Sequence, residues 1–241
     1  MENIQKFAIP IAIVIAGALI AGAVYFASIG RGQAGNGAPG APAQPKVNIK
    51  DVKIAGEPYI GNENAPVTMA YWSDYQCPFC RAVQVGGIPQ IPISPALPSL
   101  IKDYVDTGKL KIVFKDFAFL GNDSLTAALY EHAIWELYPG KFYQWRKAMF
   151  EAQDAEGDQG FGNEESILKL IGTIPGLDAN RLKALVAEKK DAYSQAIDAD
   201  RTEGASFGIQ GTPGFIIGTK FIAGADQLSA FTTAIDAQLK K

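Results

Sequence analysis

The chain has little of what metal and nucleic-acid sites are built from: among 241 residues there are two cysteines and one histidine. A structural zinc site needs four ligands, mostly Cys and His, so these three side chains do not complete one. Acidic residues (25) outnumber basic ones (22), the net charge is −3, and the sequence contains no run of Lys and Arg. We therefore expect neither a resident metal ion nor nucleic acid as a partner.

The two cysteines form a single motif, Cys77-Pro78-Phe79-Cys80. The preceding segment 66–72 is β-branched and aromatic, which predicts a buried strand that leads into a helix. With Cys77 at the N-cap and Pro78 at the first helical position, the free amides and the positive helix end favour the Cys77 thiolate. A thiolate with a second thiol one turn away is typical of a redox centre. A structural disulfide is the alternative, although so small a loop would add little stability.

A second motif, the GTP of residues 211–213, precedes a late apolar segment. Alone, a proline that opens a strand is an ordinary edge residue. Together with SDYQCPFC at 73–80, it resembles the DsbA-type thiol–disulfide oxidoreductases, in particular their membrane-anchored bacterial branch. The resemblance covers residues 57–239. It implies a cis bond at Pro213 and a Thr212 backbone that pairs with an extended substrate segment beside the first cysteine.

The same resemblance implies an α/β fold, in which a thioredoxin-like mixed sheet is interrupted by an inserted all-helical domain. The pattern of the sequence agrees, because segments 109–117, 213–217 and 220–223 have strand character and 122–204 shows only helical periodicity. An edge strand is expected within 47–60. The predicted boundaries are 47–120 with 205–241 for the thioredoxin-like domain, and 121–204 for the inserted domain.

Helix ends follow from turn and capping residues. The helix after the second cysteine is expected to stop near Val85, because two glycines and four prolines follow in 86–98. Relatives usually continue a helix here, so 86–98 is interpreted as an inserted loop, and a new helix is expected to begin at Pro95 and to run to about residue 107. Side chains expected to cap later helices are Asn163, Asp178 and Asp226.

The N-terminal segment is the longest apolar run of the chain. Residues 7–29 could cross a hydrocarbon core of about 30 Å as a helix. A cleaved signal peptide is the alternative, but its apolar region would be about 7–15 residues long. We expect an uncleaved membrane anchor at 1–30 and a Gly-, Ala- and Pro-rich flexible linker at 31–46. A disulfide centre belongs in an oxidising compartment, so the catalytic domain is expected to be extracytoplasmic.

The motif residues are expected to have separate roles. Cys77 is the reactive thiol that forms a mixed disulfide with substrate, and Cys80 closes the internal disulfide. Pro78 and Phe79 between them tune the pKa of Cys77. The redox-active disulfide needs no bound cofactor.

One position departs from the family pattern. Relatives commonly carry an acid six residues before the first cysteine, where it can handle protons near the buried sulfur, but here that residue is Tyr71. Lys115 and Asp74 are the remaining ionisable candidates for proton handling, although Asp74 is better explained as a turn residue. His132 lies on an apolar helical face and is interpreted as a hydrogen-bonded core residue.

The sequence thus predicts an extracytoplasmic oxidoreductase that donates its Cys77–Cys80 disulfide to exported proteins. The resemblance implies a membrane partner that reoxidises it by passing electrons to quinone. Two alternatives stay open, namely a reductase or isomerase on the same fold, and a non-catalytic binding module with a structural disulfide.

Overall fold

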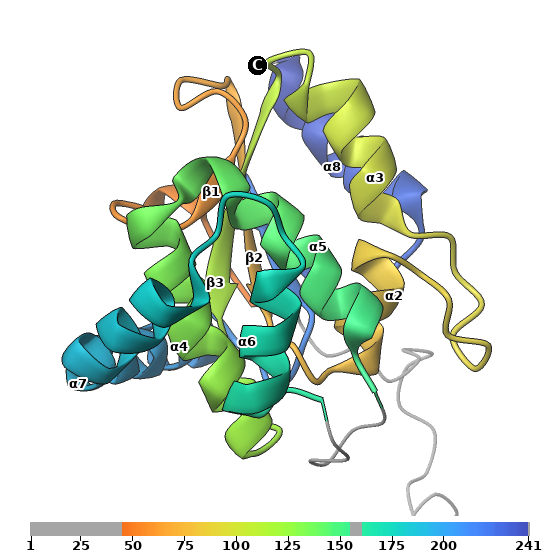
Figure 1. Cartoon of the computed structure of the whole chain (residues 1–241). Coiled ribbons are helices and arrows are strands. Elements are labelled where there is room, and N and C mark those ends of the chain that lie inside the picture. The colour runs from red at the N-terminus through yellow and green to blue at the C-terminus, as the bar shows by residue number, and fades with distance from the viewer. Residues whose placement is uncertain (1–44, 155–160, 241) are drawn as a thin grey trace, which may run out of the picture. The chain divides into compact units, whose positions relative to one another are not determined.

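The computed structural model describes residues 45–154 and 161–240, which belong to one compact unit (Figure 1). Five strands form one mixed sheet in the order β1-β3-β2-β4-β5. Strands β2 and β3 are parallel and the other pairs are antiparallel. The strands are β1 (Tyr59–Ile60), β2 (Val67–Ser73), β3 (Leu110–Asp116), β4 (Gly214–Ile217) and β5 (Lys220–Ala223). The predicted mixed sheet is therefore confirmed, including an edge strand within 47–60.

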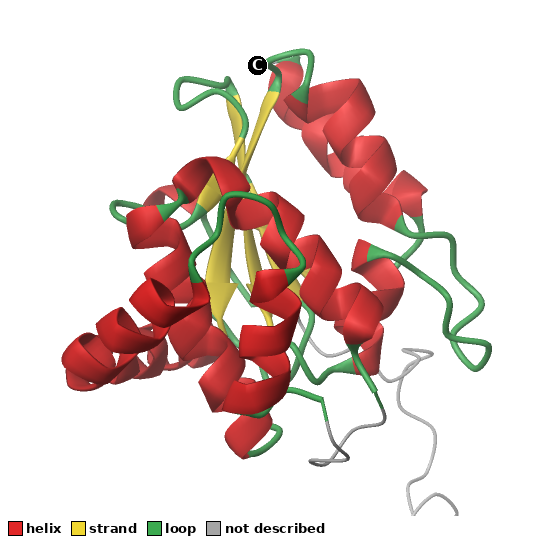
Figure 2. Cartoon of the chain, viewed as in Figure 1, coloured by secondary structure: helices red, strands yellow, loops and turns green. Residues whose placement is uncertain are grey.

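The helices surround this sheet, as Figure 2 shows in red against the yellow strands. They are α2 (Pro78–Gln84), α3 (Ala96–Leu100), α4 (Asn122–Leu137), α5 (Phe142–Ala152), α6 (Glu164–Gly172), α7 (Ala179–Ser206) and α8 (Leu228–Leu239). Short helical turns are η1 (Ile49–Asp51), the π-helical η2 (Ile101–Val105) and η3 (Pro139–Lys141). Between β3 and β4 the described residues contain only helices and loops, as predicted.

Strand β2 is the centre of the fold because both of its faces are buried. Tyr71 lies opposite Phe114 of β3 and Phe215 of β4. The next residue, Trp72, lies opposite Lys115. Successive side chains of a strand point to opposite faces, so Tyr71 and Phe114 belong to one face of the sheet, and Trp72 and Lys115 to the other.

The two faces carry cores of different size. On the Tyr71 face, side chains from α2 to α8 pack into a large apolar core. On the Trp72 face, a smaller core is covered by residues 47–54 and by Phe207 after α7. Helix α7 approaches Trp72 so closely that a Cβ at Gly204 would lie 2.9 Å from the indole ring. Glycine at this position therefore lets the end of α7 pack on the sheet.

The helix ends follow the capping predictions with one exception. Helix α2 stops at Gln84, and Gly86 has a positive φ of 74°, a conformation that glycine adopts without strain. The Asn163 and Asp178 side chains accept hydrogen bonds from the amides three residues on and cap α6 and α7. The prediction for Asp226 is wrong, because the N-cap of α8 is Gln227 and Asp226 accepts the Gln227 amide instead.

The expected anchor and linker, residues 1–46, lie almost wholly outside the described part of the chain. Among the described residues, 45–154 and 161–240, no helix has the length and apolar character needed to cross a membrane.

Candidate redox site

The CxxC motif lies where β2 gives way to α2. Cys77 is the N-cap residue, with extended backbone angles (φ −77°, ψ 119°), and Pro78 opens the helix. Both thiols are free and buried, and Cys80 is completely inaccessible. By contrast, the Phe79 side chain is 48% exposed. The local sequence thus places one sulfur at the helix start and the other one turn inside.

The pKa of Cys77 is lowered to about 7. The largest cause is a hydrogen bond with the Cys80 side chain. Burial opposes the shift, but the Thr212 side chain and the Cys80 and Phe79 amides, which can donate hydrogen bonds to a thiolate, lower the pKa further. Amides at the first turn of a helix thus act as predicted.

The pKa of Cys80 moves in the opposite direction, well above its ordinary value. Burial is the main cause, and the hydrogen bond and negative charge of Cys77 add to it. Because the sulfur with the lower pKa is the better leaving group, the pair is chemically asymmetric. Cys77 can carry the thiolate at neutral pH, whereas Cys80 stays a thiol.

The second sequence motif, residues 211–213, lies next to the CxxC motif in the fold. The Thr212–Pro213 peptide bond is cis, as the family resemblance implied. The Cys77 thiol donates a hydrogen bond to the Thr212 carbonyl oxygen, with 3.3 Å between the two atoms. A pocket of about 500 Å³ lies beside this contact, and its lining includes Phe79, Thr212 and Phe221. The two motifs, 77–80 and 212–213, therefore meet at the sulfur pair, and Phe79 and Thr212 also line the pocket.

Asp74 holds the turn before the motif. Its carboxylate accepts hydrogen bonds from the amides of Gln76, Phe119 and Leu120 and from the Ser124 hydroxyl, at 2.6–3.1 Å. Burial raises its pKa against these bonds, which lower it. The carboxylate thus ties β2 to the start of α4, in agreement with its interpretation as a turn residue.

Lys115 was predicted as a candidate for proton handling, and the structure places it elsewhere. It lies on the Trp72 face, away from the cysteines, where its ammonium group contacts Glu57 at 2.7 Å, Glu203 at 3.2 Å and Asp200. The expectation of proximity to the buried sulfur is therefore wrong. The physical reason is the pleat of the sheet, because Phe114 occupies the side of β3 that faces the cysteines.

No group of three or more His, Cys, Asp or Glu side chains in residues 45–154 and 161–240 is arranged to hold a metal ion. The acidic side chains at Glu57, Asp200 and Glu203 are gathered around the Lys115 ammonium instead.

Sequence reasoning missed a clamp that joins α5 to the motif. The Gln153 side chain donates hydrogen bonds to the carbonyl oxygens of Tyr75 (2.7 Å) and Cys77 (3.1 Å). In return, the Arg81 side chain donates to the Gln153 carbonyl oxygen at 2.6 Å. Nothing in the local sequence signals this clamp, because its members are 72–78 residues apart.

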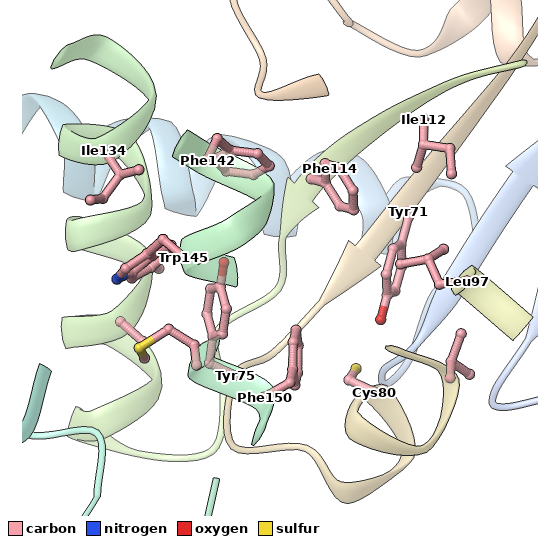
Figure 3. Packing of buried hydrophobic residues seen from close by; sticks show 14 of the residues in the cluster. Tyr71, Tyr75, Cys80, Leu97, Ile112, Phe114, Ile134, Phe142, Trp145 and Phe150 are labelled. Carbon is pink, nitrogen blue, oxygen red and sulfur yellow. The ribbon is translucent and has the colours of Figure 1, made fainter. Parts of the chain in front are cut away.

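A buried guanidinium group was missed as well. Arg146 is inaccessible to solvent, and its charge lies 4.3 Å from the centroid of the Phe114 ring and 5.1 Å from that of Tyr71. It donates to Glu131 at 3.2 Å and to the Ser73 hydroxyl at 2.6 Å. Figure 3 labels four aromatic rings whose centroids lie within 5.2 Å of the Arg146 guanidinium group, namely Tyr71, Tyr75, Phe114 and Phe150. The available signal was a lone basic residue on the apolar face of the 142–150 helix.

His132 is a hydrogen-bonded core residue, as predicted. Its ring stacks on Tyr193 and its Nε2 lies 2.9 Å from an Asp116 carboxylate oxygen. Burial lowers its pKa, but the hydrogen bond and charge of Asp116 outweigh burial and raise the pKa to about 9.

With this geometry in place, comparison with known proteins identifies the family. A family profile described as Thioredoxin matches residues 53–237, which is most of the chain. The chain belongs to this thioredoxin family. It is 26% identical over 187 residues to disulfide bond formation protein D of Bacillus subtilis, an alignment that covers 78% of this chain and 79% of that protein. It is also 27% identical over 183 residues to the probable disulfide bond formation protein D of Bacillus anthracis, covering 76% of this chain and 78% of the relative.

Solved structures agree with this assignment. Oxidised BdbD from Bacillus subtilis superposes with a TM-score of 0.66 and 25% identity, covering 82% of this chain and 97% of that one. The thiol–disulfide exchange protein α-DsbA2 from Wolbachia pipientis gives a TM-score of 0.62 and 29% identity, covering 75% and 86%. These relatives are named for disulfide bond formation or for thiol–disulfide exchange, and the chain is a thiol–disulfide oxidoreductase of the DsbA type.

Proposed function

We propose that the protein introduces disulfides into exported proteins by donating a Cys77–Cys80 disulfide. The observation that carries this proposal is the asymmetry of the two sulfurs: the pKa of Cys77 is lowered to about 7 and that of buried Cys80 is raised. Such a pair accepts electrons from a substrate thiolate and returns Cys77 as a stabilised thiolate.

The exchange proceeds in two displacements. A substrate thiolate attacks the Cys77 sulfur, the internal disulfide breaks, and Cys80 leaves as a thiolate that later takes a proton from solvent. A second substrate thiolate then attacks the substrate sulfur of the mixed disulfide, and Cys77 leaves as a thiolate. Two substrate thiols are oxidised to a disulfide, and the Cys77–Cys80 disulfide is reduced to the pair that the structure contains.

The substrate segment is proposed to lie along the Thr212–Pro213 loop. The Thr212 backbone borders both Cys77 and the 500 Å³ pocket, and half-exposed Phe79 forms part of the pocket wall. An extended peptide that pairs with backbone groups there would present its cysteine to Cys77, as in other cases of strand addition.

A reductase or isomerase is the second candidate, and one observation favours it. A thiol pKa of about 7, which is the value found for Cys77, matches thioredoxin at about 7 better than DsbA at about 3.5. A less depressed pKa stabilises the reduced pair less and makes the disulfide a weaker oxidant.

The redox equilibrium of the full chain in glutathione buffers decides between these candidates. A potential near about −120 mV, with disulfides formed in a reduced unfolded protein, supports the oxidase, whereas a value near about −270 mV supports a reductase. If the two thiols do not exchange with glutathione at all, the disulfide is structural and the non-catalytic alternative stands.

We further propose that residues 7–29 anchor the protein in a membrane, that the catalytic domain is extracytoplasmic, and that a quinone-linked membrane protein reoxidises it. The apolar run in the sequence and the need of disulfide chemistry for an oxidising compartment support this arrangement. Alkaline extraction of membranes tests the anchor, since an anchored chain stays in the pellet. Release of the full-length chain into the supernatant would contradict it.

A further inference from the structure

The Tyr71 ring is tightly enclosed in the core that contains the redox pair. It is completely buried on β2, stacks on Phe215 with 4.5 Å between ring centroids, and lies 5.9 Å from Phe114. The Arg146 guanidinium group covers the same ring at 5.1 Å. Because two aromatic rings and a cation pack against the Tyr71 ring, this packing sets the direction in which its hydroxyl points.

That hydroxyl is directed at the buried cysteine. In Figure 3 the Tyr71 oxygen lies at the end of the ring that faces the Cys80 sulfur. Among the described residues, no partner meets the usual distance and angle limits for a hydrogen bond with this hydroxyl. Burial is the main cause that raises the pKa of Tyr71, and the nearby Cys80 sulfur raises it further when it carries a negative charge. A buried donor without a well-formed bond is unusual in a folded protein and calls for an explanation.

We propose that the Tyr71 hydroxyl is a catalytic hydrogen-bond donor to the Cys80 sulfur, which it stabilises whenever that sulfur becomes a thiolate. The inference rests on the proposed roles of Cys77 and Cys80. It also gives a function to the residue that replaces the family's acid on this strand.

The donor acts at the step in which the internal disulfide breaks. When a substrate thiolate bonds to the Cys77 sulfur, the electron pair of the broken bond moves to Cys80, inside the core. Since a thiolate accepts a hydrogen bond more strongly than a thiol, the contact that is poorly formed in the reduced pair becomes well formed at this step. The pKa of Tyr71 lies well above its ordinary value, so Tyr71 keeps its proton and solvent finally protonates Cys80.

Arg146 supports the same charge from behind the ring. Burial lowers the pKa of Arg146, and the charges of Tyr75, Glu131 and Tyr71, followed by that of Cys80, raise it. Glu131 partly offsets the cation, at 3.2 Å from it. Arg146 is a positioning residue in this scheme, because it acts through Tyr71 and touches no reacting atom.

The test compares Tyr71→Phe with Tyr130→Phe in the full chain. Tyr130 is equally buried, but its hydroxyl bonds to Glu164. The reduced protein is mixed with excess oxidised glutathione, which forms a mixed disulfide at Cys77. Attack of Cys80 on Cys77 then releases glutathione, and acid quenching with mass spectrometry gives the rate of this step across the pH range.

The pH midpoint of the release step reports the pKa of Cys80 in the mixed disulfide. In Tyr71→Phe we expect the midpoint to rise by about one pH unit, a tenfold loss of thiolate at a given pH, which is the lower end of the effect of one hydrogen bond to a charged group. The step itself slows less, by several-fold, because a more basic thiolate is a better nucleophile. Tyr130→Phe keeps the wild-type midpoint. A Tyr71→Phe protein that folds and matches Tyr130→Phe would overturn the proposal.

A second substitution keeps the hydroxyl and changes its strength. Ring fluorination makes a phenol a stronger hydrogen-bond donor, so 3-fluorotyrosine placed at position 71 alone should lower the midpoint, opposite to Tyr71→Phe. A midpoint that rises or stays in place with this analogue contradicts the proposal, even if Tyr71→Phe fails to fold.

The same assay separates this inference from the proposed function. If wild-type protein never forms the mixed disulfide at Cys77, the proposed exchange chemistry is wrong. If wild type exchanges and the midpoint does not depend on Tyr71, only the role of Tyr71 is wrong.

Discussion

The two faces of the central sheet each bury a cation, and they treat it differently. On the Trp72 face, Lys115 is met by the carboxylates of Glu57, Asp200 and Glu203. On the Tyr71 face, Arg146 has one carboxylate partner, Glu131, and is otherwise surrounded by aromatic rings.

This difference separates stability from reactivity. The Lys115 cluster offers its cation more acceptors than it needs, so it fixes the positions of β3 and α7. The Arg146 face leaves buried polar atoms without well-formed bonds, among them the Tyr71 hydroxyl and the Thr212 hydroxyl, both close to the sulfurs. Under-satisfied polar groups in a low-dielectric interior respond strongly when a charge appears beside them.

The largest effect is expected from Cys77→Ser, which removes the reactive thiol on the Tyr71 face and leaves the Trp72 face unchanged. In Cys77→Ser we expect disulfide donation to a reduced unfolded protein to be abolished, because the hydroxyl cannot form the mixed disulfide. The unfolding free energy should change by less than about 1 kcal/mol, since the side chains are similar in size. Cys80→Ser is the matched control: with oxidised glutathione as the disulfide donor, its Cys77 thiolate should displace one glutathione thiolate and the mixed disulfide should accumulate. Donation that survives Cys77→Ser would show that the motif is not the reactive centre.

The opposite outcome is expected at Lys115. Lys115→Met leaves three buried carboxylates without their cation and should lower the unfolding free energy by about 3–5 kcal/mol in urea titrations. The rate of exchange at Cys77 should stay within about twofold of the wild-type rate, because the Lys115 cluster and the cysteines lie on opposite faces of the sheet. Exposed Lys109, near the start of β3, provides the control Lys109→Met, which should be near neutral. A Lys115→Met protein with wild-type stability and slow exchange would show that Lys115 contributes to reactivity and not to stability, contrary to this comparison.

A smaller effect depends on pH and on His132. Its pKa is 6.5 in an unfolded chain and about 9 in the fold, because protonated His132 pairs with Asp116. A group with a raised pKa contributes stability that is fully present below pH 6.5 and is lost as the pH rises through 9. The loss is on the order of 3 kcal/mol.

Urea unfolding of wild type and His132→Gln across this range measures the His132 contribution by difference. Glu131 and Asp200 also have raised pKa values, of about 7 and about 8. Asp200 remains in the variant and cancels, whereas the His132 charge lowers the pKa of Glu131, so the difference includes the coupling between His132 and Glu131. An unchanged difference between the two proteins across the range would mean that the ion pair does not carry the pH dependence.

The smallest effect is expected at the pocket. Phe79→Ser removes half-exposed apolar surface from its wall and should raise KM for a cysteine-containing peptide by about fivefold, with kcat nearly unchanged. The pKa of Cys77 should stay near its wild-type value, since the Phe79 contribution comes from its backbone. Unchanged KM would place the peptide outside this pocket.

Much of the fold could be predicted because its signals are local. Alternation in 109–117, helical periodicity in 122–204 and the caps at Asn163 and Asp178 all depend on residues a few positions apart. The Asp226 cap failed within this same range, because the helix begins one residue later than an Asp226 N-cap would place it.

The site could be predicted only in part. The two motifs were found because each has a specific short sequence, and their meeting was implied by the family resemblance. Lys115 was misplaced because its face depends on the register between β2 and β3, which a single strand does not specify. Arg146 and Gln153 were missed because their partners are distant in the sequence. The partners of Gln153 are 72 or more residues away, and those of Arg146 are 15 and 73 residues away.

The sequence by itself therefore determined the chemistry of the motif: a cysteine at an N-cap, a proline at the first helical position and a second cysteine one turn on, all of which follow from local backbone geometry. Only the tertiary structure decided how that chemistry is tuned. It buried Cys80, brought the Thr212 carbonyl to Cys77, and placed the Tyr71 hydroxyl and the Arg146 charge behind the sulfurs. Burial and charge separation depend on the packing of distant segments, so no short stretch of the chain contains them.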